Sequence, residues 1–279
     1  MDFPTSEARR RYGELVKAAA GALTALDFDG TLSPIVADPA RAAIHPDGPG
    51  VLARLAGQVR AVAVITGRPA REVVDLARLT DVASGMPEQG RLLVLGQYGN
   101  ERWDSGSAEF STAEPPTGLA AVRAQLPAVL ARAEAQDAHV EDKRIAIAVH
   151  TRRLTDPQQA FERLLGPLGE LAAAHGLSAE PGRMVVEVRA PGMDKGSALH
   201  RAVAETGASA VVFAGDDLGD LPAFVAAEQM RAEGMPALLV CSGSPEQTAL
   251  AERADLVVDG PAGVLHFLSA FAADVSAGR

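Results

Sequence analysis

Short apolar runs alternate with amphipathic stretches at both ends of the chain. The apolar runs cover residues 22–28, 60–66, 91–99, 208–217, 236–242 and 255–260. The helical patterns between and around them cover residues 6–20, 50–57, 69–79, 221–231 and 245–254, and a last helix follows residue 260. Strands that alternate with helices predict a parallel sheet covered by helices on both faces. The two ends of the chain therefore predict one doubly wound α/β domain.

The middle of the chain has a different pattern. A helical stretch at about 115–137 is followed by strand patterns at 139–143 and 144–152, a helix at 156–175 and a hairpin at 177–190. Two helices with consecutive strands predict a small α+β unit inserted into the first domain. Proline and small residues at 106–118 predict the entry hinge, and 189–193 the exit. We expect a core domain at 1–107 and 190–279, and an inserted domain at 108–189.

Composition and charge indicate the cellular location and exclude some classes of binding partner. The chain has 279 residues, 47% of them hydrophobic, one cysteine and a net charge of −10. A single cysteine excludes an intramolecular disulfide, and the first residues lack the apolar stretch of a secretory signal, so we expect a cytoplasmic protein. No stretch approaches the ~20 apolar residues of a membrane helix. Without a basic tract, neither nucleic acid nor an anionic membrane is an expected partner.

Two aspartates end the first apolar run. Asp27 and Asp29 are separated by one residue and followed by Gly30 and Thr31. Such a pair offers one carboxylate to attack a substrate and a second to move protons. Aspartate before glycine is also ordinary turn chemistry. An EF-hand is excluded because the glycine comes at the fourth position of the acidic run and no glutamate closes the loop.

Three further polar motifs follow in order. In chain order they are Thr66-Gly67-Arg68, DKGSAL with Lys195, and the segment GDDLGD from Gly215. The first and the last come directly after apolar runs, and DKGSAL opens a helical pattern. In open α/β sheets the ligand crevice lies beyond the carboxyl ends of the strands, so these motifs can converge. Separately, each also fits a strand exit, a helix N-cap or an exposed lysine. Their joint occurrence favours one shared site.

Convergence of so many acids requires a cation. Two unit charges ~5 Å apart repel by about 3 kcal/mol at an effective dielectric constant of ~20. Carboxylate oxygens suit Mg²⁺, and the absence of Cys and His from these motifs argues against zinc. Lys195 supplies a second positive charge, and Thr66 with loop amides can hold phosphate oxygens. We therefore expect phosphoryl transfer, in which Asp27 forms an aspartyl-phosphate and Asp29 protonates the leaving oxygen.

The four motifs resemble the haloacid dehalogenase (HAD) superfamily of phosphatases: DFDGT, ITGR, Lys195 and GDDLGD. Within it, the segments DFDGTLSPI, GQYGNE, VEDKRIAIAVHTR, MVVEVRAPGMDKGSAL and GDDLGDLPAF resemble trehalose-6-phosphate phosphatases. The resemblance implies a Rossmann-like core with a mobile cap domain between the second and third motifs. It implies hydrolysis of trehalose 6-phosphate, a small phosphosugar, and functional pairing with a trehalose-6-phosphate synthase.

The resemblance also implies residue roles. Asp27 would be the nucleophile and Asp29 the general acid/base, with Thr66 and Lys195 completing the catalytic set. Mg²⁺ would be held by Asp27, the Asp29 carbonyl and Asp216, with Asp220 in support. The substrate would be bound by Gly67, Arg68, Glu141, Lys143, Arg152, Arg183 and Glu187.

Some positions depart from the family pattern and leave alternatives open. Gly219 and Leu221 stand where threonine and glutamate are usual, and Arg183 where lysine is common. A phosphatase of another sugar phosphate, such as sucrose or glucosylglycerol phosphate, differs only in its cap contacts. A non-catalytic phosphosugar-binding module would have lost the nucleophile, the acid/base or the lysine, and all three are present.

Overall fold

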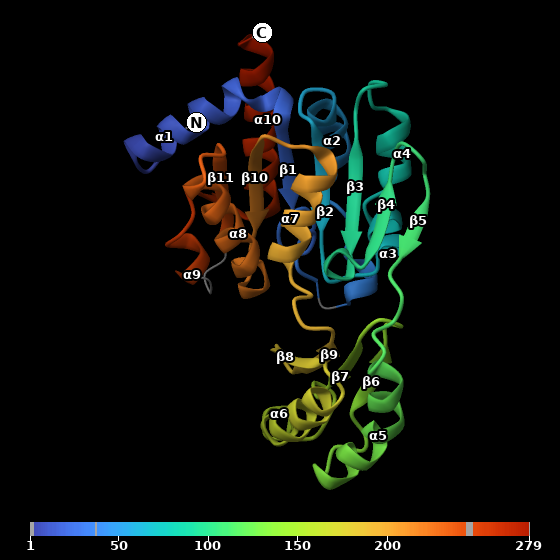
Figure 1. Ribbon diagram of the computed structural model, residues 1–279. Coiled ribbons are helices and arrows are strands. Elements are labelled where there is room, and N and C mark those ends of the chain that lie inside the picture. Colours follow the sequence, from blue (N-terminus) through green and yellow to red (C-terminus); the bar gives the residue numbers. More distant parts are fainter. Residues whose placement is uncertain (1–2, 37, 244–247, 279) are drawn as a thin grey trace. The chain divides into compact units, whose positions relative to one another are not determined.

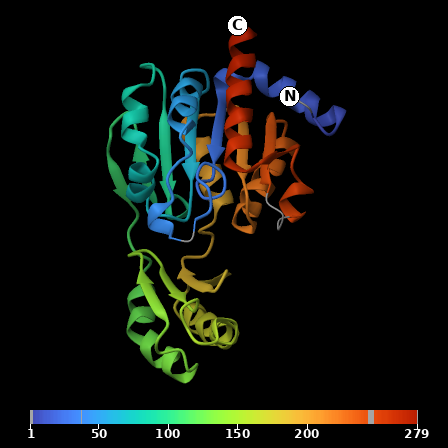
Figure 2. The ribbon, with the colours of Figure 1, turned by 180° about the vertical axis from the view of Figure 1, so that it is seen from behind.

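The computed structural model describes residues 3–36, 38–243 and 248–278. Its contacts divide the chain into two compact units (Figures 1 and 2). The core unit comprises residues 1–112 and 194–279, and the inserted unit comprises residues 113–193. The sequence pattern predicts these two boundaries after residues 107 and 189 instead.

An eight-stranded sheet forms the centre of the core unit. Its order is β12 (Leu256–Asp259), β11 (Ala237–Gly243), β10 (Ala210–Gly215), β1 (Ala22–Leu26), β2 (Ala61–Ile65), β3 (Leu92–Gly96), β4 (Glu101–Asp104) and β5 (Phe110–Thr112). The strands from β12 to β3 are parallel, whereas β4 and β5 extend the sheet antiparallel. The sheet is therefore mostly parallel, as expected for an α/β core.

Helices cover both faces of this sheet. On one face lie α1 (Ser6–Lys17), α2 (Gly48–Ala56), α3 (Ala70–Leu76), α4 (Leu79–Ser84) and α10 (Gly260–Ala277). On the other lie α7 (Lys195–Thr206), α8 (Leu221–Ala232) and α9 (Thr248–Ala251). In Figure 1, α7 and α8 lie in front of the sheet, and in Figure 2, α10 lies in front of its opposite face. Side chains of β1 alternate between the two faces, so that Leu26 packs in the first core and Leu23 in the second.

The inserted unit is a small antiparallel sheet with two helices. The sheet order is β6 (His139–Asp142), β7 (Ile147–His150), β9 (Val185–Arg189) and β8 (Ser178–Gly182). The helices α5 (Leu119–Arg132) and α6 (Pro157–Ala174) pack on one face of it, against Ile147, Val149, Val186 and Val188. The predicted strand pair and hairpin of this segment are confirmed.

Several predicted elements differ from the structure. The helix expected at 69–79 is two helices, because Arg78 adopts a left-handed φ of 52° that ends the first. The hinge expected at 106–118 contains β5, which pairs with β4 in the core sheet. Of the helix expected at 245–254, residues 245–247 lie outside the described residues and α9 covers 248–251.

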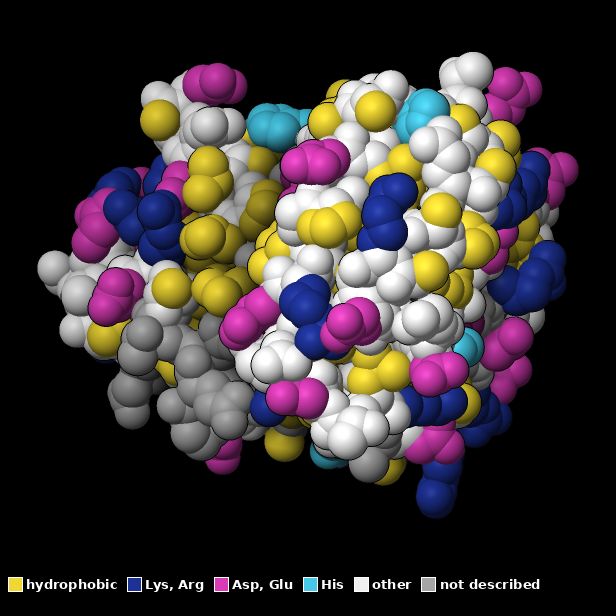
Figure 3. All heavy atoms as spheres, turned by 90° about the horizontal axis from the view of Figure 1, so that it is seen from below, with side chains coloured by type: hydrophobic (Ala, Val, Ile, Leu, Met, Phe, Trp, Pro, Cys, Tyr) yellow, Lys and Arg dark blue, Asp and Glu magenta, His cyan; other side chains and the backbone are white. Residues whose placement is uncertain are grey.

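The surface carries charges of both signs. On the face shown in Figure 3, acidic and basic side chains are interspersed among apolar and uncharged ones. Within the described ranges, every helix is too short or too polar to cross a bilayer.

Candidate active site

Three carboxylates and one lysine meet at the carboxyl edge of the core sheet. Asp27 follows β1 and Asp216 follows β10; the backbone N–H of Asp27 donates to the Ala214 carbonyl at 2.9 Å, which aligns the two strand ends. Carboxylate oxygens of Asp27, Asp216 and Asp220 lie within 4.8 Å of one another. The Lys195 Nζ lies 2.7 Å from both Asp27 Oδ1 and Asp220 Oδ1. All four residues are 5% exposed or less.

Local structure fixes each of these side chains. Lys195 is the first residue of α7, whose N-cap Asp194 accepts a hydrogen bond from the Ser197 N–H. The other oxygen of Asp220 accepts bonds from the N–H groups of Asp216 and Asp217, at 2.9 and 3.1 Å. This loop therefore holds the Asp216 and Asp220 backbones together before any ligand binds.

The electrostatics of the cluster favour an added cation. Burial raises the pKa of Asp27, and the charges of Asp220 and Asp216 act in the same direction, although Lys195 opposes them. Burial and the charge of Asp220 raise the pKa of Asp216 to about 7. Burial lowers the pKa of Lys195, but Asp220 and Asp27 together raise it above its usual value, so the ammonium stays charged. Three carboxylates and one ammonium carry a net charge of −2 when ionised, which a divalent cation would balance.

The donor set fits a hard divalent cation such as Mg²⁺. All side-chain ligands that the cluster offers are carboxylate oxygens. Gly30, at a φ of +74°, makes room for them, because a Cβ at this position would lie 2.1 Å from Asp216 Oδ2. The buried Ser242 hydroxyl donates to the Gly30 carbonyl at 2.6 Å and fixes this turn. Ser242 was missed in the sequence, where a serine ending an apolar run gives no specific signal.

The second predicted acid, Asp29, lies beside the Thr66–Arg68 segment. Arg68 Nε and Nη2 donate to the two Asp29 carboxylate oxygens at 2.6 and 2.8 Å, and Arg68 also pairs with Glu72. Thr66 is buried, and its hydroxyl accepts the Arg68 N–H at 3.2 Å. The structure thus brings together Asp29, Thr66, Gly67 and Arg68 around the ends of β1 and β2.

Three of the five predicted residues of the inserted unit share one face of its sheet. Glu141 and Glu187 both stand opposite Ala148, and Lys143 follows two residues after Glu141, so the three side chains project to the same side. Lys143 Nζ lies 2.8 Å from Glu187 Oε1. The His150 imidazole lies 3.0 Å from Glu141. This side is opposite to the one that packs on the helices.

Arg189 was missed and belongs to this polar face. Its Nη1 lies 2.9 Å from the second oxygen of Glu187, so Glu187 is bound by two cations. The alternation from Glu187 to Arg189 could have identified it. The two remaining predicted residues lie at strand ends: Arg152 follows β7, and Arg183 is in the turn between β8 and β9.

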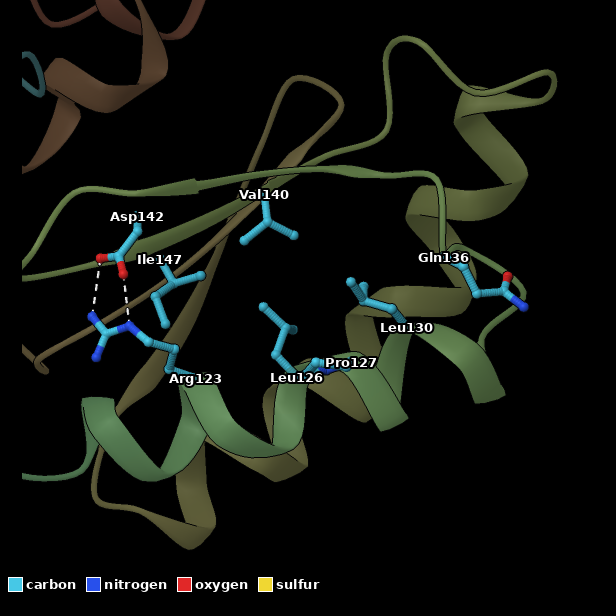
Figure 4. Close-up of a pocket in the computed structure, with 8 residues that line it drawn as sticks. All are labelled: Arg123, Leu126, Pro127, Leu130, Gln136, Val140, Asp142 and Ile147. Atoms are coloured by element: carbon cyan, nitrogen blue, oxygen red, sulfur yellow. Dashed lines mark hydrogen bonds and ion pairs between the residues drawn. The ribbon is translucent and has the colours of Figure 1, made fainter.

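A cavity of about 450 Å³ lies on the other face of this sheet. Figure 4 shows Leu126 and Leu130 of α5 pointing toward Val140 and Ile147, with Arg123 paired to Asp142 at one end. Val140 and Asp142 of β6 alternate with Glu141 and with Lys143, which follows the strand, and they point to the opposite side. None of the predicted site residues lines the cavity.

Comparison with known proteins identifies the family. The trehalose-phosphatase family matches residues 25–259, which include every predicted site residue. The chain belongs to the trehalose-phosphatase family. It is 36% identical over 231 residues to an uncharacterised glycosyl hydrolase of Mycobacterium tuberculosis, covering 78% of this chain and 16% of that protein. It is 31% identical over 267 residues to a trehalose-phosphate phosphatase of Mycolicibacterium paratuberculosis, covering 91% of this chain and 62% of that protein.

The chain thus spans less than two thirds of the length of these curated relatives. The crystal structure of the Aspergillus fumigatus trehalose-6-phosphate phosphatase superimposes with a TM-score of 0.71 at 23% identity, over 95% of this chain and 97% of that one. Solved haloacid dehalogenase-like hydrolases share the same fold. The predicted fold class is therefore confirmed for this member of the trehalose-phosphatase family.

Proposed function

We propose that the protein is an Mg²⁺-dependent phosphatase that hydrolyses trehalose 6-phosphate to trehalose and phosphate. The observation that carries the proposal is the contact of Asp27 with Lys195, beside the carboxylates of Asp216 and Asp220. A carboxylate nucleophile held by a charged lysine in a buried acidic cluster suits attack on a phosphate monoester. The family match supports the same class of reaction.

In the first step, an Asp27 oxygen attacks phosphorus and the bond between phosphorus and the sugar oxygen breaks. Asp29 gives its proton to the departing sugar oxygen. In the second step, Asp29 takes a proton from water, which attacks phosphorus and releases phosphate from Asp27. Lys195 stays charged throughout and neutralises the oxygens that gain charge.

Mg²⁺ would be held by the side chains of Asp27, Asp216 and Asp220 and by the Asp29 carbonyl, where it supplies charge neutralisation for the phosphoryl group. Thr66, Gly67 and Arg68 would bind phosphate oxygens. Sugar hydroxyls would be bound in the inserted unit by Glu141, Lys143, Arg152, Arg183 and Glu187, since carboxylate and guanidinium groups make directional hydrogen bonds. Pairing with a trehalose-6-phosphate synthase and a cytoplasmic location are part of the same proposal.

Phosphate release from a panel of substrates tests this function. The panel contains trehalose 6-phosphate, sucrose 6-phosphate, glucosylglycerol phosphate and p-nitrophenyl phosphate, each with and without Mg²⁺. We expect the highest kcat/KM for trehalose 6-phosphate and loss of turnover with a chelator. Equal turnover of all sugar phosphates would remove the trehalose assignment and leave a general phosphatase. No release from any substrate with Mg²⁺ would overturn the catalytic proposal.

A further inference from the structure

The turn that joins β3 to β4 has an unusual backbone. Gln97, Tyr98 and Gly99 have consecutive φ values of 46°, 57° and 83°. Left-handed backbone is costly for residues other than glycine, and two in succession persist only where surrounding contacts hold them. Two such contacts are present: the Asn100 amide donates to the Gln97 carbonyl at 2.8 Å, and Arg201 Nη2 donates to the Tyr98 carbonyl at 2.7 Å.

This turn holds the Thr66–Arg68 segment by its backbone. The Tyr98 N–H donates to the Thr66 carbonyl at 3.0 Å, and the Gln97 N–H donates to the Arg68 carbonyl at 2.8 Å. The carbonyls of the two residues on either side of Gly67 are therefore bound to the turn. In a trans peptide the N–H points opposite to the C=O, so the Gly67 N–H is directed away from Tyr98. The left-handed backbone thus sets the direction of the amide that the proposed function assigns to phosphate.

The Tyr98 side chain adds a contact to the same glycine. A Cβ on Gly67 would lie 2.8 Å from the Tyr98 Oη and 3.0 Å from its Cζ, so a larger residue at this position would require the ring or the segment to shift. Glu101 accepts a hydrogen bond from the Ala70 N–H at 2.7 Å and another from the Gln97 amide at 2.9 Å. The start of α3 is thereby tied to the same turn.

The turn is also tied to the helix that carries the buried lysine. Arg201, which binds the Tyr98 carbonyl, lies six residues after Lys195 in α7. A Cβ on Gly99 would lie 2.5 Å from Arg201 Nη2 and 3.2 Å from the Ala198 Cβ, so the turn packs closely on this helix. One helix therefore fixes both Lys195 and the turn that holds Thr66 to Arg68.

We propose that the Gln97–Gly99 turn positions the phosphate-binding segment Thr66–Arg68, and that Tyr98 is the positioning residue whose ring holds Gly67 in place. This inference rests on the proposed function, which assigns the segment to phosphate. It adds to the reaction a residue that touches no reacting atom and acts through Gly67.

The test measures binding of inorganic phosphate in the presence of Mg²⁺ by calorimetry, together with kcat and KM. The variants are Tyr98→Ala, Tyr98→Phe, Gly67→Ala and the double variant Gly67→Ala/Tyr98→Phe. Tyr12→Phe, at the chain's other tyrosine, is the control, since the Tyr12 hydroxyl in α1 donates to Asp274 in α10, on the face of the core sheet opposite to α7.

We expect Tyr98→Ala and Gly67→Ala to weaken phosphate binding on the order of 10- to 100-fold, the effect of a small misplacement of a binding group. Tyr98→Phe alone should change the phosphate affinity less than about threefold. In the double variant, the Tyr98→Phe change should restore part of the affinity that Gly67→Ala loses, because the Tyr98 Oη is the atom nearest to the new Cβ. The kcat/KM values for trehalose 6-phosphate and p-nitrophenyl phosphate should fall by the same factor. Tyr12→Phe should leave all of these unchanged.

Wild-type phosphate affinity in a folded Tyr98→Ala variant would overturn the positioning role, as would strictly additive effects in the double variant. A fall in melting temperature without a fall in phosphate affinity would also overturn it, since it would indicate packing alone. Calorimetry needs no turnover, so the two proposals fail separately. If the wild type shows no turnover but the variants show the expected changes in phosphate affinity, only the proposed function is contradicted.

Discussion

Arg68 binds both carboxylate oxygens of Asp29 in a two-pronged ion pair, with distances of 2.6 and 2.8 Å. The pair joins the loop after β1 to the loop after β2. In this geometry both Asp29 oxygens accept hydrogen bonds from Arg68, whereas a general acid must donate a proton from one of them. Arg68 therefore orients the Asp29 carboxylate but must release at least one of its oxygens before proton donation.

Arg68→Ala should separate a positioning role from a phosphate contact. If Arg68 acts through Asp29, kcat for trehalose 6-phosphate should fall about 100-fold, the size of a general acid contribution. p-Nitrophenyl phosphate should lose much less, because its leaving group needs no protonation. Equal losses for both substrates would leave Arg68 with only the phosphate contact that the proposed function assigns to it. Arg71→Ala is the control, because Arg71 lies three residues later, in the first turn of α3, and packs on the Phe110 ring.

Asp27→Asn should abolish turnover and keep the binding site. The amide cannot attack phosphorus, so kcat should fall by about a thousandfold or more. Trehalose 6-phosphate should still bind, because the amide keeps the shape of the site and Lys195 retains its contact with Asp220. Calorimetry with the substrate checks this, with the exposed Asp75→Asn as a control. A fall in kcat much smaller than about a thousandfold would contradict covalent catalysis at Asp27.

Mg²⁺ binding should strengthen as the pH rises through about 7. Asp216 has a pKa of about 7 in the metal-free fold, above its ordinary value of 3.8. Protons compete with Mg²⁺ below this value, so the Mg²⁺ dissociation constant should fall between pH 5.5 and 8 and level off above. Calorimetric titration at several pH values checks this. A constant affinity over the range would rule out Asp216 as the titrating ligand.

The Asp216 carboxyl should also make the metal-free protein less stable as the pH rises. A carboxyl whose folded pKa is raised contributes stability that is fully present below about pH 4 and is lost as the pH rises through 7. Added Mg²⁺ should therefore raise the melting temperature more at pH 8 than at pH 5.5. Asp216→Asn should remove this difference.

Gly30→Ala should impair the metal site while Gly50→Ala should not. A Cβ on Gly30 would meet Asp216 Oδ2 at 2.1 Å and would require a left-handed alanine, so Asp216 must move. We expect Mg²⁺ affinity to fall at least about tenfold. Gly50 lies in α2 with no atom within 4 Å of its Cβ position, so alanine there should be neutral or slightly stabilising. Circular dichroism melting and Mg²⁺ titration compare the two.

The sequence was sufficient to predict the acidic cluster because parallel strands place their ends together. Asp27 and Gly215 each end a wholly buried apolar run, and this pattern fixes both the strand and its end. The Arg68–Asp29 pair could not be predicted, because side-chain direction in a loop depends on tertiary contacts. The turn at Tyr98 was missed for a similar reason: neither Gln97 nor Tyr98 favours left-handed backbone, so local propensity gives no signal.

Glu187→Gln tests whether the polar face of the inserted unit recognises the sugar. Glu187 binds Lys143 at 2.8 Å and Arg189 at 2.9 Å, and it is 8% exposed, so the amide leaves two nearby cations without their shared counter-charge. These side chains should then shift, and KM for trehalose 6-phosphate should rise about tenfold while p-nitrophenyl phosphate is unaffected. The ratio of the two kcat/KM values cancels any loss of folded enzyme. Glu180→Gln is the matched control, because Glu180 stands opposite Glu187 in β8 but is exposed. Equal losses for both substrates in Glu187→Gln would show that this face does not select the sugar.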